Sequence, residues 1–236
     1  MRFIGEPLER IAEDHLRILR FFRFHARFGM GAPDADGLAA CTARANDLMA
    51  LSRERIANEL LRLLASDDPA PTMAVMIAHG ILKPVLPEID LVGVERLAAL
   101  VAIEAEPSAI RRLAALIGPD PALAADIAAR LRLSKAQTKR LTLATGWTVA
   151  GMPAAMAYRL GLEGAGDRLL LRGDAASAAA LRLPLALPLR GADLLAHGLS
   201  GPEVGLTLAR IESAWVDSGF PQGDAFDALV AEQLKR

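Results

Sequence analysis

Asp14 and Arg17 stand three residues apart in segment 7–28, whose apolar residues recur at helical spacing. On a continuous helix they are neighbours on one face, and Glu13 lies four residues before Arg17 on the same side. A carboxylate beside a guanidinium complements cytosine and adenine, because each base presents an amino donor next to a ring-nitrogen acceptor. Uracil and guanine reverse that polarity. The pair therefore predicts a site that selects C and A and rejects U and G.

The same two residues also fit a plain intrahelical ion pair, which would stabilise the helix only slightly. The rest of the segment is unusual for a surface helix. Arg20, Arg23 and Arg27 form a stripe with no acidic residue between positions 15 and 28, and phenylalanines and aliphatic residues cover the other sides. This pattern predicts a helix wedged between two bodies, with its arginines pointing into a cleft.

Charge is distributed unevenly along a chain whose net charge is −1. Residues 66–106 hold seven acids and two bases, whereas residues 107–147 hold seven bases and two acids. A basic segment in a neutral protein fits binding of a phosphate backbone, and Lys135, Lys139 and Arg140 are the predicted RNA contacts. Ordinary solvated helix surface is the alternative interpretation of the same charges.

Composition excludes several other classes of protein. The chain is 53% hydrophobic, enough for a core, yet charges, Gly or Pro interrupt every apolar run before the length of a membrane span. The N-terminal residues lack the pattern of a signal peptide. Cys41 is the only cysteine and the four histidines are scattered, which excludes disulfides and a structural zinc site. We expect a cytoplasmic protein that does not bind membranes.

The predicted fold is all-α, an elongated multi-helix array, because no segment shows sustained apolar–polar alternation. Ser52 is placed to cap a helix, and Ser134-Lys135-Ala136-Gln137 has the form of a capping box. Composition shifts near 146–152 and 182–191 predict joints. The expected helices cover residues 7–28, 35–50, 52–65, 70–79, 92–105, 107–117, 121–131, 134–145, 153–162, 202–218 and 223–235.

Near the C-terminus, Gly201-Pro202 predicts a helix start at 202–203, since proline suits a first turn. Backbone N–H groups there, with Gly201 and Gly205 permitting close approach, predict contact with an RNA phosphate. A tight helix–turn–helix contact between glycines is the alternative.

The remaining polar candidates are expected to be structural. Asp34-Ala35-Asp36 should form a loop and helix cap, and Asp67-Asp68-Pro69 the start of a helix. His79 and His197 should cap or pack, and Trp147 and Trp215 should lie in the core.

The motifs together resemble one family. Residues 2–7 (Arg-Phe-Ile-Gly-Glu-Pro), followed by Glu13-Asp14-x-x-Arg17, are similar to the neck of class II tRNA nucleotidyltransferases (CCA-adding enzymes) and bacterial poly(A) polymerases. Weaker similarities follow in order at 51–60, 80–88, 131–134, 189–194 and 198–205. Two departures from the family pattern, Glu6 and His15, leave Asp14 and Arg17 untouched.

The resemblance implies roles and partners. It makes Asp14 and Arg17 the readers of CTP or ATP, makes Arg20 and Arg23 contacts to the triphosphate, and makes tRNA the RNA partner. It divides the chain into a neck (1–66), a body (67–150) and a tail (151–236).

The resemblance also implies that the catalytic head of the family, which holds Mg²⁺, is missing from these residues. We therefore expect no catalytic residue, metal ligand or cofactor in this chain, which should bind but not catalyse alone. A poly(A) polymerase and a non-catalytic helical RNA-binding module remain the alternatives.

Overall fold

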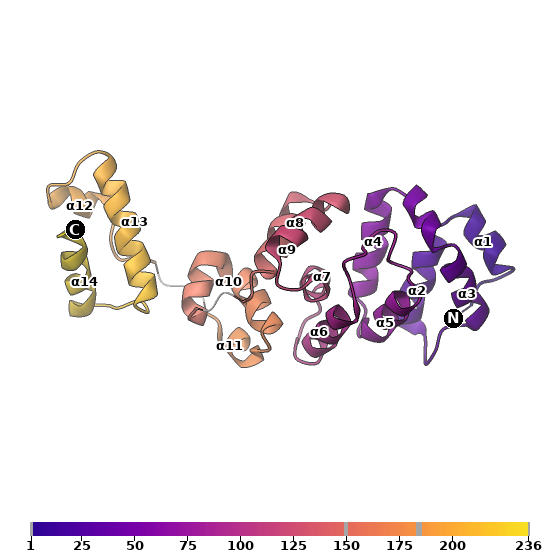
Figure 1. Ribbon diagram of the computed structural model, residues 1–236. Helices are drawn as coiled ribbons and strands as arrows, with labels where there is room; N and C mark the ends of the chain where they lie inside the picture. Colours follow the sequence, from indigo (N-terminus) through magenta and orange to yellow (C-terminus); the bar gives the residue numbers. More distant parts are fainter. Residues whose placement is uncertain (1, 149–150, 183–185, 236) are drawn as a thin grey trace. The chain divides into compact units, whose positions relative to one another are not determined.

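The computed structural model describes residues 2–148, 151–182 and 186–235, and within those ranges every regular element is a helix, fifteen in all. The all-α prediction is confirmed (Figure 1). The helices form two compact units, residues 1–149 with 167–175 and residues 150–166 with 176–236. The division into neck, body and tail stays a prediction. Both predicted joints include residues outside the described ranges, 149–150 and 183–185.

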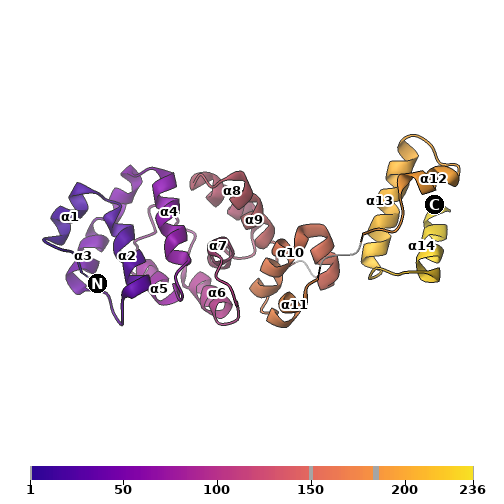
Figure 2. The same ribbon diagram turned by 180° about the vertical axis from the view of Figure 1, so that it is seen from behind.

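The first unit begins with the motif-bearing helices. Their bounds are α1 (Pro7–Glu13), α2 (Arg17–Phe28), α3 (Ala35–Ala43), the 3₁₀ helix η1 (Ala45–Ala50) and α4 (Arg53–Leu64). Figures 1 and 2 show α2 and α4 side by side from opposite directions, and the two helices pack against each other. The prediction of one helix over 7–28 is wrong, because the backbone leaves the helical region at Asp14. Likewise, the predicted helix over 35–50 is α3 followed by η1.

Five further helices complete the bulk of the first unit. They are α5 (Ala70–Ala78), α6 (Leu91–Val101), α7 (Ala109–Ile117), α8 (Pro121–Arg130) and α9 (Lys135–Ala144), all close to the predicted ranges. Helix starts follow the expected capping chemistry. The Ser52 side chain accepts from the Arg55 N–H, and Ser134 and Gln137 form the predicted capping box.

The core of this unit runs through all of these helices and contains the largest buried cluster of aliphatic and aromatic residues. Helices α6 and α7 approach each other closely within this core. A Cβ on Gly93 would lie 2.4 Å from the Leu116 carbonyl oxygen, so only glycine permits this approach. Predicted core residue Trp147 is buried here. Helix α7 also packs against α4, which carries residues of the site described below.

The second unit has its own smaller core around Trp215, which is fully buried as predicted. Its helices are the first part of α10 (Pro153–Leu171), α12 (Gly191–Ala196), α13 (Pro202–Asp217) and α14 (Asp224–Leu234), with α11 (Ala175–Ala180) at the boundary between units. Gly161, at φ 76°, breaks α10 into two pieces. The sequence did not predict α11, α12 or the second piece of α10, because they are short and lack a clear apolar stripe.

The structural assignments of the minor candidates are confirmed. Asp34 caps α3 by accepting from the Gly37 N–H at 2.9 Å, and Asp68 accepts from the Ala70 N–H at 3.0 Å. His79 is the C-cap residue of α5, and His197 is the C-cap residue of α12. Across the described ranges, no helix is both long enough and apolar enough to cross a bilayer.

Tyr158, the only tyrosine, allows a direct test of the packing between α10 and α13 in the second unit. Its hydroxyl donates a hydrogen bond to Glu212, and this bond, with burial and the negative charge of the carboxylate, raises the pKa of Tyr158 to about 12. Glu212→Gln should move the pKa back toward about 10, because the phenolate then faces no charge. Absorbance titration of the phenolate measures both values. Identical midpoints in the two proteins would contradict the contact.

Candidate nucleotide site and RNA-contacting surfaces

Asp14 lies in the break between α1 and α2. Its backbone is extended, at φ −154° and ψ 105°, and its Oδ1 accepts from the Leu16 N–H at 3.1 Å. The Arg55 Nη2, from α4, donates to Oδ1 at 3.1 Å and to Oδ2 at 3.3 Å. The carboxylate is therefore fixed from both sides but keeps 26% of its surface exposed. An ionised carboxylate has about four acceptor positions, so some remain open to a ligand.

The ionisation state of Asp14 suits an acceptor. Partial burial would raise its pKa, but the Leu16 N–H and the Arg55 guanidinium act in the opposite direction and hold the pKa below its usual value. The group is consequently a carboxylate at neutral pH, which accepts hydrogen bonds and donates none. That is the form needed to receive the amino group of cytosine or adenine.

Arg17 opens α2 on the other side of the break. The prediction that Asp14 and Arg17 are neighbours on one face of a continuous helix is wrong, because the turn at 14–16 separates α1 from α2. Arg17 instead pairs with Glu13 and donates to the Arg10 carbonyl at 2.7 Å. No Asp14–Arg17 ion pair exists within the described chain, so the plain intrahelical interpretation does not hold for these two residues.

A pocket of about 320 Å³ adjoins Arg17 and Arg20. Its walls combine guanidinium groups with aromatic rings, of which Phe3 stacks on Phe21 with centroids 5.3 Å apart. Cationic and aromatic walls together suit a nucleotide, because phosphates bind arginine and bases stack on flat rings. The lining residues are Arg2, Phe3, Ile4, Arg10, Arg17, Arg20, Phe21 and Phe24.

Arg20 and Arg23, the predicted triphosphate contacts, share a buried partner. The Glu59 side chain of α4, 4% exposed, accepts from the Arg23 Nε at 2.6 Å and the Arg20 Nε at 3.4 Å. The Arg20 Nη1 also lies 4.0 Å from the Asp14 Oδ2. Glu59 thus orients both guanidinium groups while their outer N–H groups stay available. Their role as triphosphate contacts stays a prediction.

Two residues of α4, Arg55 and Glu59, belong to the site although sequence reasoning gave them no role. They stand four apart, so they share one face of α4, and this face turns toward α2. Their spacing could have indicated this role. Arg55 has the charge opposite to that of Asp14, and Glu59 has the charge opposite to that of the α2 arginines. Only packing of the two helices shows that the charges meet.

The basic segment 107–147 is largely neutralised inside the protein. Arg130 binds Glu88 through two hydrogen bonds, and Arg132 binds Glu54. Other bases of the segment bind buried acids: Arg111 and Arg112 pair with Glu104, and Arg111 and Arg140 with Asp167. Two of these four acids, Glu88 and Glu104, belong to the acidic segment 66–106, and the surface is less basic than the charge count suggested.

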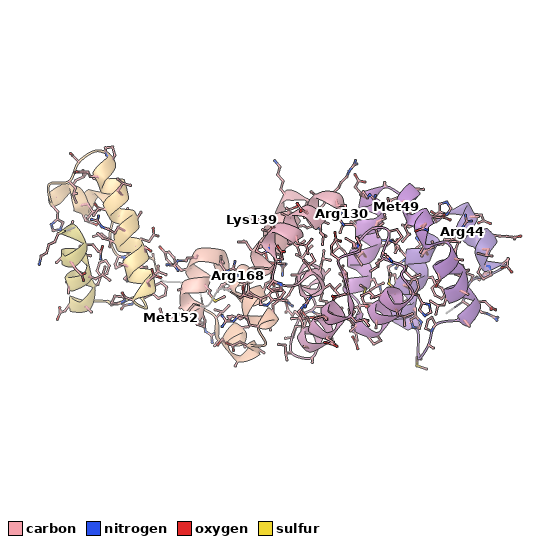
Figure 3. The ribbon with its side chains drawn as sticks, in the orientation of Figure 1. Arg44, Met49, Arg130, Lys139, Met152 and Arg168 are labelled. Atoms are coloured by element: carbon pink, nitrogen blue, oxygen red, sulfur yellow. The ribbon has the colours of Figure 1, made fainter. Side chains whose placement is uncertain are left out.

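Lys135 and Lys139 are the exposed cations left on α9 (Lys139 is labelled in Figure 3). Neither forms an ion pair with any described residue. Arg140 differs from them, since its Nε donates to the buried Asp167 at 2.7 Å and its Nη2 at 3.0 Å. Contact of these three residues with RNA stays a prediction, and the two lysines are its better-placed members.

Gly201 and Gly205 lie at the start of α13, where the helix start at Pro202 is confirmed. A Cβ at either position would meet no atom within 4 Å, so the alternative of a tight glycine contact is wrong for the residues described. Gly201 needs glycine for its positive φ of 58°. Gly205 is exposed and has ordinary helical geometry, so nothing in the fold requires glycine there. Their contact with a phosphate stays a prediction.

Parts of the chain are similar in sequence to known proteins. Residues 33–92 match a family described as the probable RNA and SrmB-binding site of polymerase A. The mouse mitochondrial CCA tRNA nucleotidyltransferase is 44% identical over 69 residues, and a multifunctional CCA protein of Pseudomonas syringae pv. syringae is 40% identical over 103 residues. The predicted resemblance to class II CCA-adding enzymes and poly(A) polymerases is confirmed.

Solved structures of CCA-adding enzymes share the fold. One, in complex with CTP, matches 97% of the chain with a TM-score of 0.67 at 17% identity. The Thermotoga maritima enzyme complexed with tRNA matches 97% with a TM-score of 0.65 at 16% identity. The chain spans 62% of each of these structures, and its matched segments cover 16% of the mouse protein and 25% of the Pseudomonas protein.

Proposed function

We propose that residues 1–236 form the nucleotide-selecting and tRNA-holding portion of a CCA-adding nucleotidyltransferase. Asp14 and Arg17 read the base of CTP or ATP, and Arg20 and Arg23 bind the triphosphate. Lys135, Lys139 and the start of α13 hold tRNA. Phosphoryl transfer itself needs Mg²⁺ held by carboxylates, which we assign to a catalytic head that is not among these residues.

One observation supports this proposal most strongly: the fixing of Asp14 in the helix break by the Leu16 N–H and Arg55. A structural ion pair would not need the break, since Glu13 already pairs with Arg17 at helical spacing. The break instead presents an ionised acceptor beside the first turn of α2, where Arg17 supplies a donor. That is the polarity of a reader for cytosine and adenine.

A poly(A) polymerase is the second candidate, because the family matched at 33–92 is described for polymerase A. The two functions differ in the nucleotides that they need. A CCA-adding enzyme must accept both CTP and ATP, whereas a poly(A) polymerase needs ATP alone.

Competition binding of the four nucleoside triphosphates tests the proposal. CTP and ATP should each bind at least about tenfold more tightly than UTP and GTP, since a mismatched base edge costs about 1–3 kcal/mol. Preference for ATP alone would favour the poly(A) polymerase. Equal binding of all four would refute base reading by Asp14 and Arg17.

A further inference from the structure

The contact between α2 and α4 is organised as a ladder of charges. Arg20, Arg23 and Arg27 share one face of α2, and Arg55, Glu59 and Arg62 share one face of α4. The first rung joins Arg55 to Asp14. The second joins Glu59 to Arg20 and Arg23. Each acid in these two rungs is shared by more than one arginine, so local positive charge is only partly neutralised.

The third rung has two bases and no acid between them. Arg27 and Arg62 are both exposed and line one pocket of about 590 Å³, and neither is ion-paired within the described chain. The lining includes one acid, Asp67, against three arginines, a formal balance of +2. Like charges in one pocket repel, and a bound anion would relieve the repulsion. The full lining is Arg23, Arg27, Phe28, Arg62, Ala65, Ser66 and Asp67.

An exposed aromatic ring completes this pocket. Phe28 is 65% exposed at the end of α2, although a large apolar side chain is normally buried. Phe24 supports it at a centroid distance of 6.3 Å, and the Arg27 guanidinium lies 5.4 Å from its ring centre. A supported ring beside guanidinium groups that have no ion-pair partner is the combination that binds single-stranded nucleic acid, with bases on the rings and phosphates on the cations.

We propose that the Arg27–Arg62 pocket binds one nucleotide of a single-stranded RNA segment, with its phosphate between Arg27 and Arg62 and its base stacked on Phe28. This site is separate from the proposed base reader, since neither Asp14 nor Arg17 lines the Arg27–Arg62 pocket. It rests on the proposed function in that the RNA is the substrate strand. Stacking on a ring reads no base edge, so the site tolerates any base.

Fluorescence anisotropy with a labelled single-stranded RNA oligonucleotide measures the phosphate contacts. Arg27→Gln/Arg62→Gln should weaken binding and lower the salt slope of log K by about 0.7, because the two arginines share one phosphate and each phosphate contact on a single strand contributes about 0.7. The control Arg44→Gln/Lys83→Gln also removes two positive charges, at other positions of the first unit, and should leave the slope unchanged. Equal slopes in all three proteins would overturn the proposal.

Substitutions of Phe28 test the stacking. Phe28→Leu keeps an apolar side chain but removes the ring, so binding should weaken about tenfold, whereas Phe28→Trp should retain it. Circular dichroism establishes that each variant is folded. Weakening by the arginine variant without any effect of Phe28→Leu would reveal a site for anions only and overturn the RNA assignment.

Competition with inorganic tripolyphosphate distinguishes a site for RNA from a site for any free polyphosphate. It should displace the RNA only weakly, because it offers no base to Phe28. Displacement as strong as that by unlabelled RNA would overturn the proposal. Failure of the base reader appears in a different measurement, the relative binding of the four nucleoside triphosphates, and not in the salt slope of oligonucleotide binding.

Discussion

Replacing Arg112 with methionine is expected to lower the free energy of unfolding of the first unit by about 3–5 kcal/mol. Arg112 is 1% exposed and pairs with the equally buried Glu104. Its guanidinium also donates to the carbonyls of Leu64 at 2.6 Å and Asp67 at 3.1 Å, and to that of Ser66. These carbonyls lie at and just beyond the end of α4, where helical partners run out. Methionine fills similar space but leaves them unpaired.

Urea denaturation with pulsed thiol labelling measures this loss. Cys41 is the only cysteine, it is fully buried in the first unit, and burial raises its pKa to about 12. It therefore reacts only when that unit opens. Glu54→Gln, which breaks the exposed pair with Arg132, is the control and should leave stability unchanged. An Arg112 variant as stable as this control would show that the buried network contributes nothing.

Asp14→Ala is expected to remove the preference for CTP and ATP over UTP and GTP, a change of about 10- to 100-fold in the ratio of dissociation constants. The carboxylate is the acceptor for the amino group that only cytosine and adenine present. Because its pKa lies below the usual value, the preference should also stay constant from neutral pH down to mildly acidic pH. Competition binding of the four triphosphates gives the ratios.

Two further variants make the assignment specific. Asp36→Ala removes the same charge from an exposed position on α3 and should leave the preference intact. Arg55→Ala removes the group that fixes Asp14, and should weaken the preference by a smaller factor because the Leu16 N–H still holds Oδ1. A preference that survives Asp14→Ala would mean that other residues select the base.

Most of the fold was predictable because its local signals agree. Ser52 and Ser134 begin helices where capping chemistry placed them, and the apolar stripes gave most helix ranges to within a few residues. The break at Asp14 was not predictable in this way. Its surroundings have helical periodicity, and the turn depends on Asp14 accepting from Leu16 and on Arg55, which is 41 positions away in sequence.

The site was only partly predictable for a similar reason. Residue types identified Asp14, Arg17, Arg20 and Arg23, but a charge count cannot show which charges meet. Arg140 seemed a surface cation in the sequence, yet it holds the buried Asp167. Long-range ion pairs depend on packing between helices, which the periodicity of each helix alone does not specify.

The most direct test of a tRNA-holding role is tRNA binding by this chain at about 50 mM and about 200 mM salt. Lys135→Glu/Lys139→Glu is compared with Lys83→Glu/Lys235→Glu, which changes the other two lysines of the chain, both exposed. Arg140 is left unchanged, because its loss would leave buried Asp167 without a partner. We predict binding that weakens with salt, and that only the first variant weakens it further, with a salt slope lower by about one per lysine. Binding that is absent, or equal in both variants, would contradict a tRNA-holding role for α9.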